Sequence, residues 1–490
     1  MKVKIFKIAV MSFVVVCLFL GTFSTTSCVK EDEYLESLHE LQFSVDTLSF
    51  DTVFTTLGST TKQVKVYNTS NRPIKFDKVS LKEGGNSRFR INVDGDTSLV
   101  IRDFTIASHD SAFIFVRVNI NPNSSTSPFL VEDGIVFELG NNTKTLALTA
   151  YGRNAIYHTP TNSLTSGEVV YNYSVIDCSK PWDASKPHII FGYAVVDEDS
   201  VLTILQGTEI YFADGATLWV YDGGTLNVDG SLQNPVLFTS LRKDGHYENL
   251  PGQWQGLWLS AGSKNNVING AVLQNGTVGI LVDTVVNNNP TLTITNSMVQ
   301  NMSLAGIYGQ GAHIEGDNLL VSNCGTATLA LTLGGKYKFS NSTFANYWSY
   351  SARRSPGVIF NNWYTDLYGN IQFRPISFAE FYNCIIYGSA EEELLFDCAE
   401  GTDINTAFYN CLIRTKQTNI GTQTDTKTNE DPKFVDTKAN NYHLAAESAA
   451  LYAGNSAYIE IPYDLDNVLR NNPPSIGAYE YVEATEERDK

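Results

Sequence analysis

A group of aromatic and arginine residues in the second half of the chain could bind sugars. It consists of Tyr347, Trp348, Tyr350, Arg353 and Arg354. Aromatic faces stack on the apolar faces of sugar rings, and guanidinium groups donate paired hydrogen bonds to oxygen acceptors. These residues are therefore our candidates for a glycan-binding site, although large aromatic residues also fill buried cores.

Two acidic residues near the C-terminus could bind a cation. Asp464 and Asp466 stand in the segment DLDNVLR, and hard cations such as Ca²⁺ are held by carboxylate oxygens. A turn capped by an aspartate explains the same pattern. Calcium is the cofactor that the sequence leaves open, and otherwise we expect none.

The N-terminus has the features of an exported lipoprotein. Lysines at positions 2, 4 and 7 precede an apolar run over residues 8–20, which is too short to cross a bilayer of about 30 Å as a helix. The polar segment TFSTTSC follows, and it resembles a lipoprotein box. That resemblance implies that residues 1–27 are a removed signal peptide and that Cys28 carries the lipid anchor. Plain secretion is the alternative.

The residues after Cys28 bear on where the protein is located. The stretch KEDE resembles the tag that sends some lipoproteins of Gram-negative bacteria to the outer face of the outer membrane. It therefore implies an outer-membrane protein that faces the exterior. Residues 28–42 are acidic and are expected to form a tether.

Charge and cysteine content limit the partners and the chemistry. The 490 residues carry a formal net charge of −18, which would repel nucleic acid phosphates but leaves glycans and surface proteins as partners. Apart from Cys17 in the signal peptide and Cys28, the odd number of remaining cysteines and the lack of a CxxC motif indicate neither a disulfide framework nor a zinc site. These cysteines are Cys178, Cys324, Cys384, Cys398 and Cys411.

Residues 43–153 predict an antiparallel β-sandwich. Segments such as QVKVYN and SAFIFVRVNI alternate apolar and polar residues, and Gly, Asn and Pro turns separate them. The segments YNTSNRPIKF and LTAYGRNA resemble the immunoglobulin-like modules that precede many bacterial surface domains. Such modules act as spacers or docking units, and we find no catalytic group of residues in this one.

A repeat of short apolar segments follows within residues 201–430. Seven segments, among them ITNSMVQN and GDNLLVSN, align on one column at intervals of 20 to 27 residues. A repeat of this length without helical periodicity predicts a β-helix, with the column in turns about 4.8 Å apart and its amides hydrogen-bonded to one another. The column consists of Gly270, Asn296, Asn318, Asn341, Asn361, Asn383 and Asn410.

Residues 201–480 resemble the pectate-lyase-like superfamily of right-handed parallel β-helices. The segment PGQWQGLWLSAGSKNNVINGAVLQN resembles its early coils, and DLDNVLRNNPPSIGAYEY resembles part of its closing segment. The resemblance implies an all-β protein in which the antiparallel sandwich precedes a right-handed parallel β-helix over residues 201–430. A connector and cap would occupy residues 154–200, and a closing segment residues 431–490.

The superfamily contains lyases, hydrolases, adhesins and inert stalks, so the resemblance implies no single activity. A lyase would need carboxylates on adjacent coils to hold calcium and a basic residue to accept a proton. The best group of such residues does not share one column of the repeat. It consists of Asp366, Arg374, Glu391, Glu392, Glu393, Asp397 and Arg414.

The aromatic residues of the same coils divide into two sets. Trp363 and Tyr364 fall in the inward apolar columns of the alignment and are expected in the core. The candidates at positions 347–354 lie in a less regular stretch and are expected at the surface. The sequence therefore favours a non-catalytic surface lipoprotein that binds a glycan or a surface partner, and a polysaccharide lyase or glycoside hydrolase is the alternative.

Overall fold

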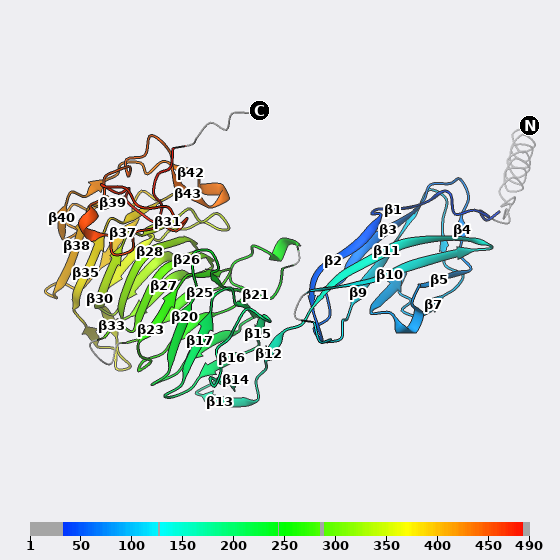
Figure 1. Ribbon diagram of the computed structural model, residues 1–490, viewed down its shortest axis with the longest axis horizontal. Helices are drawn as coiled ribbons and strands as arrows, with labels where there is room; N and C mark the ends of the chain where they lie inside the picture. The colour runs from blue at the N-terminus through cyan, green and yellow to red at the C-terminus, as the bar shows by residue number, and fades with distance from the viewer. Residues whose placement is uncertain (1–32, 126–127, 244, 285–288, 484–490) are drawn as a thin grey trace, which may run out of the picture. The chain divides into compact units, whose positions relative to one another are not determined.

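The computed structural model describes residues 33–125, 128–243, 245–284 and 289–483 (Figure 1). The chain divides into two compact units, Met1–Asn154 and Ala155–Lys490. The predicted signal peptide and Cys28 lie outside the described residues. Within the described ranges, no helix is long and apolar enough to cross a membrane.

The first unit is a sandwich of two β-sheets, and alternation along each strand buries one face. A four-stranded antiparallel sheet contains, in order, β1 (Leu41–Phe43), β3 (Lys62–Asn68), β9 (Ser111–Val118) and β6 (Phe89–Val93). A five-stranded sheet, in which β2 and β11 run in parallel, contains β2 (Thr47–Phe54), β11 (Asn142–Arg153), β10 (Phe129–Leu139), β5 (Lys78–Leu81) and β7 (Val100–Ile101). The remaining elements are the pair β4 (Ile74–Lys75) and β8 (Thr105–Ile106), and the 3-10 turn η1 (Gly84–Asn86).

The sandwich begins earlier in the sequence than expected. Leu38 and Leu41 are buried in its core, and Leu35 packs against that core. Strand β1 also pairs with β3. The described end of the segment 28–42 is therefore part of the sandwich and does not form the expected tether. Burial of its leucines in the core stabilises the fold.

The second unit is a right-handed parallel β-helix, as predicted, and strands of successive coils stack into two long sheets. An 18-stranded parallel sheet contains β12 (Ile156–His158), β15 (His188–Ile190), β17 (Val201–Leu205), β18 (Glu209–Phe212), β20 (Thr225–Asp229), β21 (Val236–Ser240), β23 (Asn266–Asn269), β24 (Ala271–Gln274), β26 (Leu292–Met302), β28 (His313–Cys324), β30 (Gly335–Ser340), β31 (Thr343–Asn346), β35 (Ile376–Tyr382), β36 (Ile385–Gly388), β38 (Ile404–Tyr409), β39 (Leu412–Ile413), β40 (Thr422–Thr424) and β41 (Lys427–Thr428).

A ten-stranded sheet forms a second wall of the β-helix, and it is parallel except for its first pair. It contains β13 (Asn162–Ser166), β14 (Val169–Val175), β16 (Tyr193–Val196), β19 (Thr217–Val220), β22 (Gly256–Leu259), β25 (Val278–Val282), β27 (Ala305–Gln310), β29 (Ala327–Thr332), β32 (Val358–Asn361) and β37 (Leu394–Asp397). Shorter elements of this unit are β33 (Trp363–Thr365), β34 (Ile371–Phe373), β42 (Phe434–Asp436), β43 (Asn441–Leu444) and the 3-10 turns η2 (Gly245–Tyr247), η3 (Thr437–Ala439) and η4 (Ser456–Tyr458).

The β-helix starts before residue 201. Strand β12 pairs in parallel with β15, and β14 pairs in parallel with β16. Residues 154–200, expected to form a connector and cap, therefore already contribute strands to both sheets.

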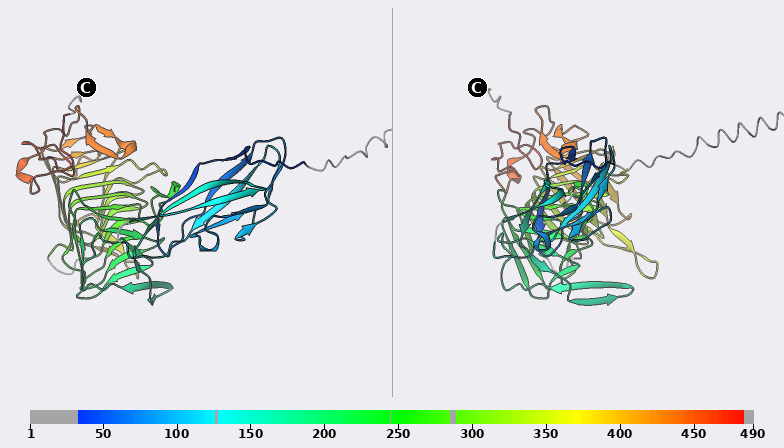
Figure 2. Two further views of the ribbon diagram at one scale, coloured as in Figure 1. Left: turned by 45° about the vertical axis from the view of Figure 1, so that its right-hand side comes forward. Right: turned by 90° about the vertical axis from the view of Figure 1, so that its right-hand side faces the viewer.

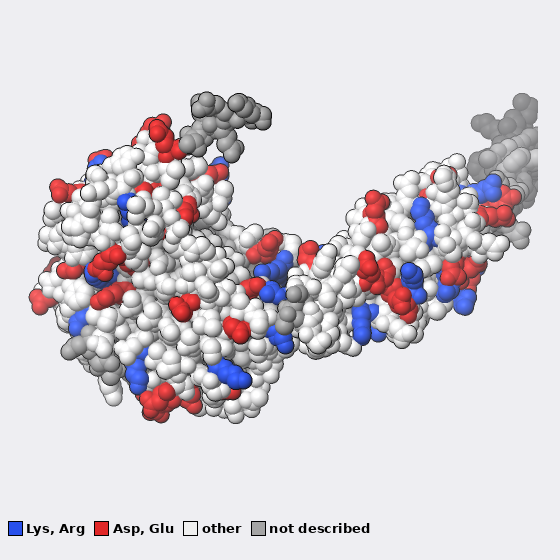
Figure 3. Space-filling model, in the orientation of Figure 1, with Lys and Arg blue, Asp and Glu red and all other residues white. Residues whose placement is uncertain are grey.

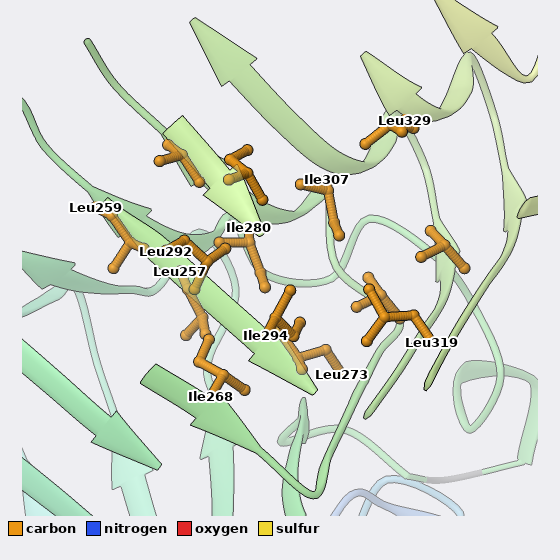
Figure 4. Packing of buried hydrophobic residues seen from close by; sticks show 14 of the residues in the cluster. Leu257, Leu259, Ile268, Leu273, Ile280, Leu292, Ile294, Ile307, Leu319 and Leu329 are labelled. Carbon is orange, nitrogen blue, oxygen red and sulfur yellow. The ribbon is translucent and has the colours of Figure 1, made fainter. Parts of the chain in front are cut away.

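Inward-facing aliphatic side chains stack along the β-helix and form its core (Figure 4). In the ten-stranded sheet Ile280, Ile307 and Leu329 are in-register partners on β25, β27 and β29, and all three are fully buried. Each such side chain stabilises the fold by about 1.5–3 kcal/mol. Ile268 and Ile294 from the larger sheet pack into the same cluster.

The asparagine column forms the predicted turns over most of its length. Its backbone φ angles lie in the left-handed region, for example 52° at Asn296, 57° at Asn318 and 45° at Asn341. Asparagine tolerates this region better than other residues with a Cβ. Asn318 Nδ2 donates to Asn296 Oδ1 at 2.8 Å, and Asn383 Nδ2 donates to Asn341 Oδ1 at 3.0 Å.

The assignment of Asn361 to this column is wrong. Asn361 ends β32 in the other sheet, opposite Asp397, and the column passes directly from Asn341 to Asn383. The chain between them forms one long coil, in which β33 and β34 make an antiparallel hairpin. Figure 2 shows this hairpin as a yellow projection from the β-helix.

The expected core positions of Trp363 and Tyr364 are wrong for the same reason. Both side chains lie on the projecting hairpin and are only half-buried. Trp363 Nε1 donates to Asp397 Oδ1 at 3.2 Å, and Arg374 lies over the Tyr364 ring. The prediction placed both aromatic residues by their distance in sequence from Asn361. Because Asn361 is not in the asparagine column of this lengthened coil, that distance does not lead to an inward-facing position.

The closing segment lies along the asparagine column. Carbonyl oxygens of the segment accept hydrogen bonds from four side-chain amides of the asparagine column, at 3.0 to 3.3 Å. The donor and acceptor pairs are Asn318 to Tyr463, Asn341 to Tyr458, Asn383 to Asn455 and Asn410 to Ala453. The column therefore anchors residues that lie far away in sequence.

Candidate functional site

A second asparagine column lies beside the first. Asn275, Asn301 and Asn323 have φ angles of 68°, 58° and 51° and end the aligned segments INGAVLQN, ITNSMVQN and GDNLLVSN. Asn301 Nδ2 donates to Asn275 Oδ1 at 2.7 Å. We did not identify this column from the sequence, although the shared final asparagine of the aligned segments was a usable signal.

The second column lines a pocket of about 600 Å³, a volume that suits a small-molecule or oligosaccharide ligand. Its wall combines side chains from three successive coils with three loops. The lining residues are Asn249, Gln274, Asn275, Gln300, Asn301, Asn323, Tyr347, Trp348, Ser349, Tyr350, Thr437, Lys438 and Asn440.

Two of the predicted aromatic residues form one wall of the pocket. The ring centroids of Trp348 and Tyr350 are 5.1 Å apart. Trp348 Nε1 donates to Ser351 Oγ at 2.9 Å, and Tyr350 Oη donates to the carbonyl oxygen of Asn249 at 2.6 Å. Because their polar atoms already have protein partners, the two rings can offer mainly their apolar surfaces to a ligand.

Tyr347 supports this wall from behind. Its ring packs against Phe434 and Tyr442 of the closing segment, with centroids 6.2 and 6.1 Å away. Burial raises the pKa of the Tyr347 hydroxyl above its ordinary value. Tyr347 therefore lines the pocket but also fixes the loop to the body of the unit.

Arg353 was predicted to contact sugar, but it is buried against Glu393. The two side chains are 3% and 0% exposed, and Arg353 Nη2 lies 2.5 Å from Glu393 Oε1. Arg353 also donates to the carbonyl oxygens of Asn346 and Ser355, and Glu393 accepts from the Gly357 N–H at 2.7 Å. This pair secures both ends of the loop that carries Trp348.

Arg354 does not line the pocket. Its side chain is exposed and lies outside the lining residues. Of the five aromatic and arginine candidates, the structure thus brings together the three aromatic ones and separates both arginines from them. Side-chain amides of the second column line the pocket, and the two arginines do not.

The third part of the wall comes from the closing segment. Asp436 Oδ1 accepts from the N–H groups of Lys438 and Ala439, which holds η3 in place. Asn440 adopts a left-handed conformation, with φ of 59°, and its Oδ1 accepts from Asn323 Nδ2. Lys438 and Asn440 thereby reach the pocket.

The predicted cation ligands Asp464 and Asp466 have other partners. Asp464 is buried, and its oxygens accept from the N–H groups of Asp466, Val468 and Glu480 at 2.7 to 2.9 Å. Asp466 Oδ2 lies 2.5 Å from His443 Nε2. The geometry is that of the capped turn, the alternative explanation of the sequence pattern.

The residues considered for a lyase site are dispersed as well. Asp366 accepts backbone N–H groups within its own hairpin, Arg374 donates to Thr284, and Glu391 pairs with Lys416. None of the seven lines the pocket. In the described part of the chain, no group of three or more His, Cys, Asp or Glu residues could hold a metal ion.

Fold and site together define an all-β protein in which a parallel β-helix carries an aromatic and amide-lined pocket. No family model and no curated protein matches the chain. Two of the solved structures that do match have a low structural similarity to it. The PapD-like domain 7 of human CEP192 has a TM-score of 0.17 and 11% identity over 27% of this chain and 97% of that one.

The second similar structure is a family 123 glycoside hydrolase from Clostridium perfringens, described as acting in glycolipid glycan hydrolysis. Its TM-score is 0.18 with 8% identity, and the match covers 25% of this chain and 28% of that one. At these TM-scores neither similarity supports an argument about function.

Proposed function

We propose that this chain is a non-catalytic cell-surface lipoprotein that binds a glycan in the pocket of its β-helix. The observation that carries the proposal is the pairing of Trp348 and Tyr350 beside a column of side-chain amides. Sugars present apolar ring faces and rings of hydroxyl groups, which such a wall complements.

The surroundings of the pocket favour binding over catalysis. A lyase or hydrolase would need an acid and a base at the pocket. The lining residues include no carboxylate and no histidine. On the face of the second unit that Figure 3 shows, acidic and basic side chains are dispersed among uncharged residues. The formal net charge of −18 also disfavours nucleic acid as a ligand.

The rest of the proposal rests on the sequence. The lipoprotein box at Cys28 and the acidic residues that follow it support anchoring in the outer membrane, with the β-helix facing the exterior. In this arrangement the sandwich would serve as a spacer. In this proposal the lipid anchor binds the membrane. The pocket binds the glycan or a surface partner.

A glycan microarray with the soluble chain from residue 29 onward tests the binding function. We expect a defined set of oligosaccharides to bind, and Trp348→Ala to weaken the best ligand at least about tenfold, or about 1.4 kcal/mol, in calorimetry. Tyr368→Ala is the matched control, because Tyr368 is 90% exposed on the hairpin outside the pocket. Equal losses in both variants, or no binding, would contradict the proposal.

A further inference from the structure

The orientation of the side-chain amides in the pocket is set by the backbone. Asn275 Nδ2 donates to the carbonyl oxygen of Glu248 at 2.9 Å, and Asn301 Nδ2 donates to that of Asn249 at 2.7 Å. A carbonyl can only accept, so each amide must place its nitrogen toward it. The side-chain oxygens consequently have fixed positions.

This arrangement leaves two acceptors at the pocket. Asn275 Oδ1 is used by Asn301 Nδ2, but Asn301 Oδ1 receives no hydrogen bond from the described residues. Gln300 donates its Nε2 toward Gln274 Oε1, and no described donor reaches Gln300 Oε1. Two lining residues therefore carry side-chain carbonyl oxygens that can accept a hydrogen bond from a ligand.

Other lining residues carry donors. Asn323 Oδ1 accepts from the Tyr347 N–H at 3.3 Å and from Tyr442 Oη at 2.7 Å, which directs Asn323 Nδ2 to Asn440 Oδ1. The Asn440 Nδ2 group then remains available, as does the Lys438 ammonium, the single charged group among the lining residues.

We propose that this pocket selects uncharged sugars, such as hexoses and N-acetylhexosamines, over uronic acids, a specificity that rests on the proposed glycan-binding function. The hydroxyl groups of a sugar can donate to Asn301 Oδ1 and accept from Asn440 Nδ2. A uronic acid carries a carboxylate in place of the hydroxymethyl group of a hexose. This carboxylate can only accept, so it cannot pair with a carbonyl oxygen of the wall and adds negative charge beside it.

Charge does not compensate for that mismatch. Arg353, which could bind a carboxylate through two parallel hydrogen bonds, is already paired with Glu393. Lys438 is a solvent-exposed point charge, and exposed ion pairs contribute little in water. The pocket thus lacks the paired cationic donors that acidic sugars require.

Calorimetric titration of the soluble chain with matched pairs of oligosaccharides tests this specificity. Glucose and galactose oligomers are compared with glucuronate and galacturonate oligomers of the same linkage. We expect the neutral member to bind at least about tenfold tighter, with less than about a twofold change between low and high salt because no ion pair forms. Lys438→Ala should keep this preference.

The outcomes separate the two proposals. Tighter binding of the uronate, or a preference for neutral sugars that disappears in Lys438→Ala, would overturn the specificity and leave glycan binding intact. Failure of both members of every pair to bind, together with no binding to any glycan of the microarray, would overturn both. Trp348→Ala should weaken the neutral ligand, while Tyr368→Ala on the hairpin should not, which places the measured binding at this pocket.

Discussion

At the scale of single residues, asparagine has four roles in the β-helix. In the first column it forms left-handed turns and links coils, and it also holds the closing segment. Between Asn318 and Asn341 the first column is interrupted by Arg470, whose Nη2 donates to Asn318 Oδ1 at 2.8 Å. In the second column asparagine lines a pocket. The same backbone conformation thus serves stability in one column and lines the proposed binding pocket in the other.

Replacing Asn318 by Leu should destabilise the β-helix by about 1–3 kcal/mol. The change removes the side-chain amide that donates to Asn296 and Tyr463, and it removes the oxygen that accepts from buried Arg470. It also places a leucine at a positive φ angle. Chemical denaturation of the second unit measures the loss. Asn227→Leu, on strand β20, is the control and should cost under about 0.5 kcal/mol. Equal denaturation midpoints would contradict the role given to the column.

Two stacked histidines near the start of the β-helix should make it sensitive to acid. His158 Nε2 lies 2.9 Å from His188 Nδ1, and Trp182 stacks on both rings. Burial lowers the pKa of His158 to about 4, and burial together with His158 lowers that of His188 to about 3, although Asp183 opposes the shift. Both rings are therefore neutral in the folded protein at neutral pH.

The sign of the effect follows from the direction of these shifts. Below its ordinary pKa of 6.5 the unfolded chain binds protons that the folded rings do not, so stability decreases as the pH falls from about 6.5 toward 4. Hydrogen-exchange protection in β12 and β15, corrected for the intrinsic pH dependence of amide exchange, should decrease over this range. In the double variant His158→Gln, His188→Gln this loss of protection should be absent, and its persistence would assign the effect to other groups.

At the scale of elements, one lengthened coil carries both the loop that lines the pocket and a projecting hairpin. The chain between Asn341 and Asn383 carries the loop with Trp348 and, further on, the projecting hairpin β33–β34. The hairpin exposes Leu367 and Tyr368 almost completely, whereas the loop is folded back onto the body. The buried pair Arg353 and Glu393 accounts for that difference.

Breaking this ion pair should release the loop from the body of the β-helix and move Trp348 and Tyr350 away from the pocket. Arg353→Met leaves the Glu393 carboxylate buried without its cation, which should cost about 3–5 kcal/mol. Faster hydrogen exchange over residues 347–357 and a shift in Trp348 fluorescence would report the release. Lys416→Met, which removes an exposed pair with Glu391, should cost under about 1 kcal/mol. Unchanged exchange in the Arg353 variant would contradict this role.

At the scale of the whole molecule, the proposed anchor decides where the pocket operates. Cys28→Ala should leave an unprocessed precursor or release the protein from membranes, because several acyl chains are needed for stable anchoring. Fractionation and metabolic labelling with a fatty acid measure both outcomes. Cys178→Ala is the matched control and should remain lipidated. A Cys28 variant that is still processed and membrane-bound would exclude the lipoprotein proposal.

The sequence by itself determined the all-β fold and most of the column of turns. Alternation with period two and a repeat of 20 to 27 residues are local properties, and each coil meets mainly its neighbours. Asn296, Asn318 and Asn383 could therefore be placed without coordinates. Asn361 could not, because an insertion changes the number of residues per coil without changing the local pattern.

The tertiary structure alone decided which polar groups share the pocket. Asn301 belongs to β26, Trp348 to a loop after β31, and Lys438 to the closing segment. These residues line one pocket because segments that are far apart in the sequence pack against one another. The sequence placed Arg353 beside the aromatic residues, but burial next to Glu393 satisfied its charge within the protein. Proximity in sequence identified the aromatic wall, whereas hydrogen bonding between distant segments determined its chemistry.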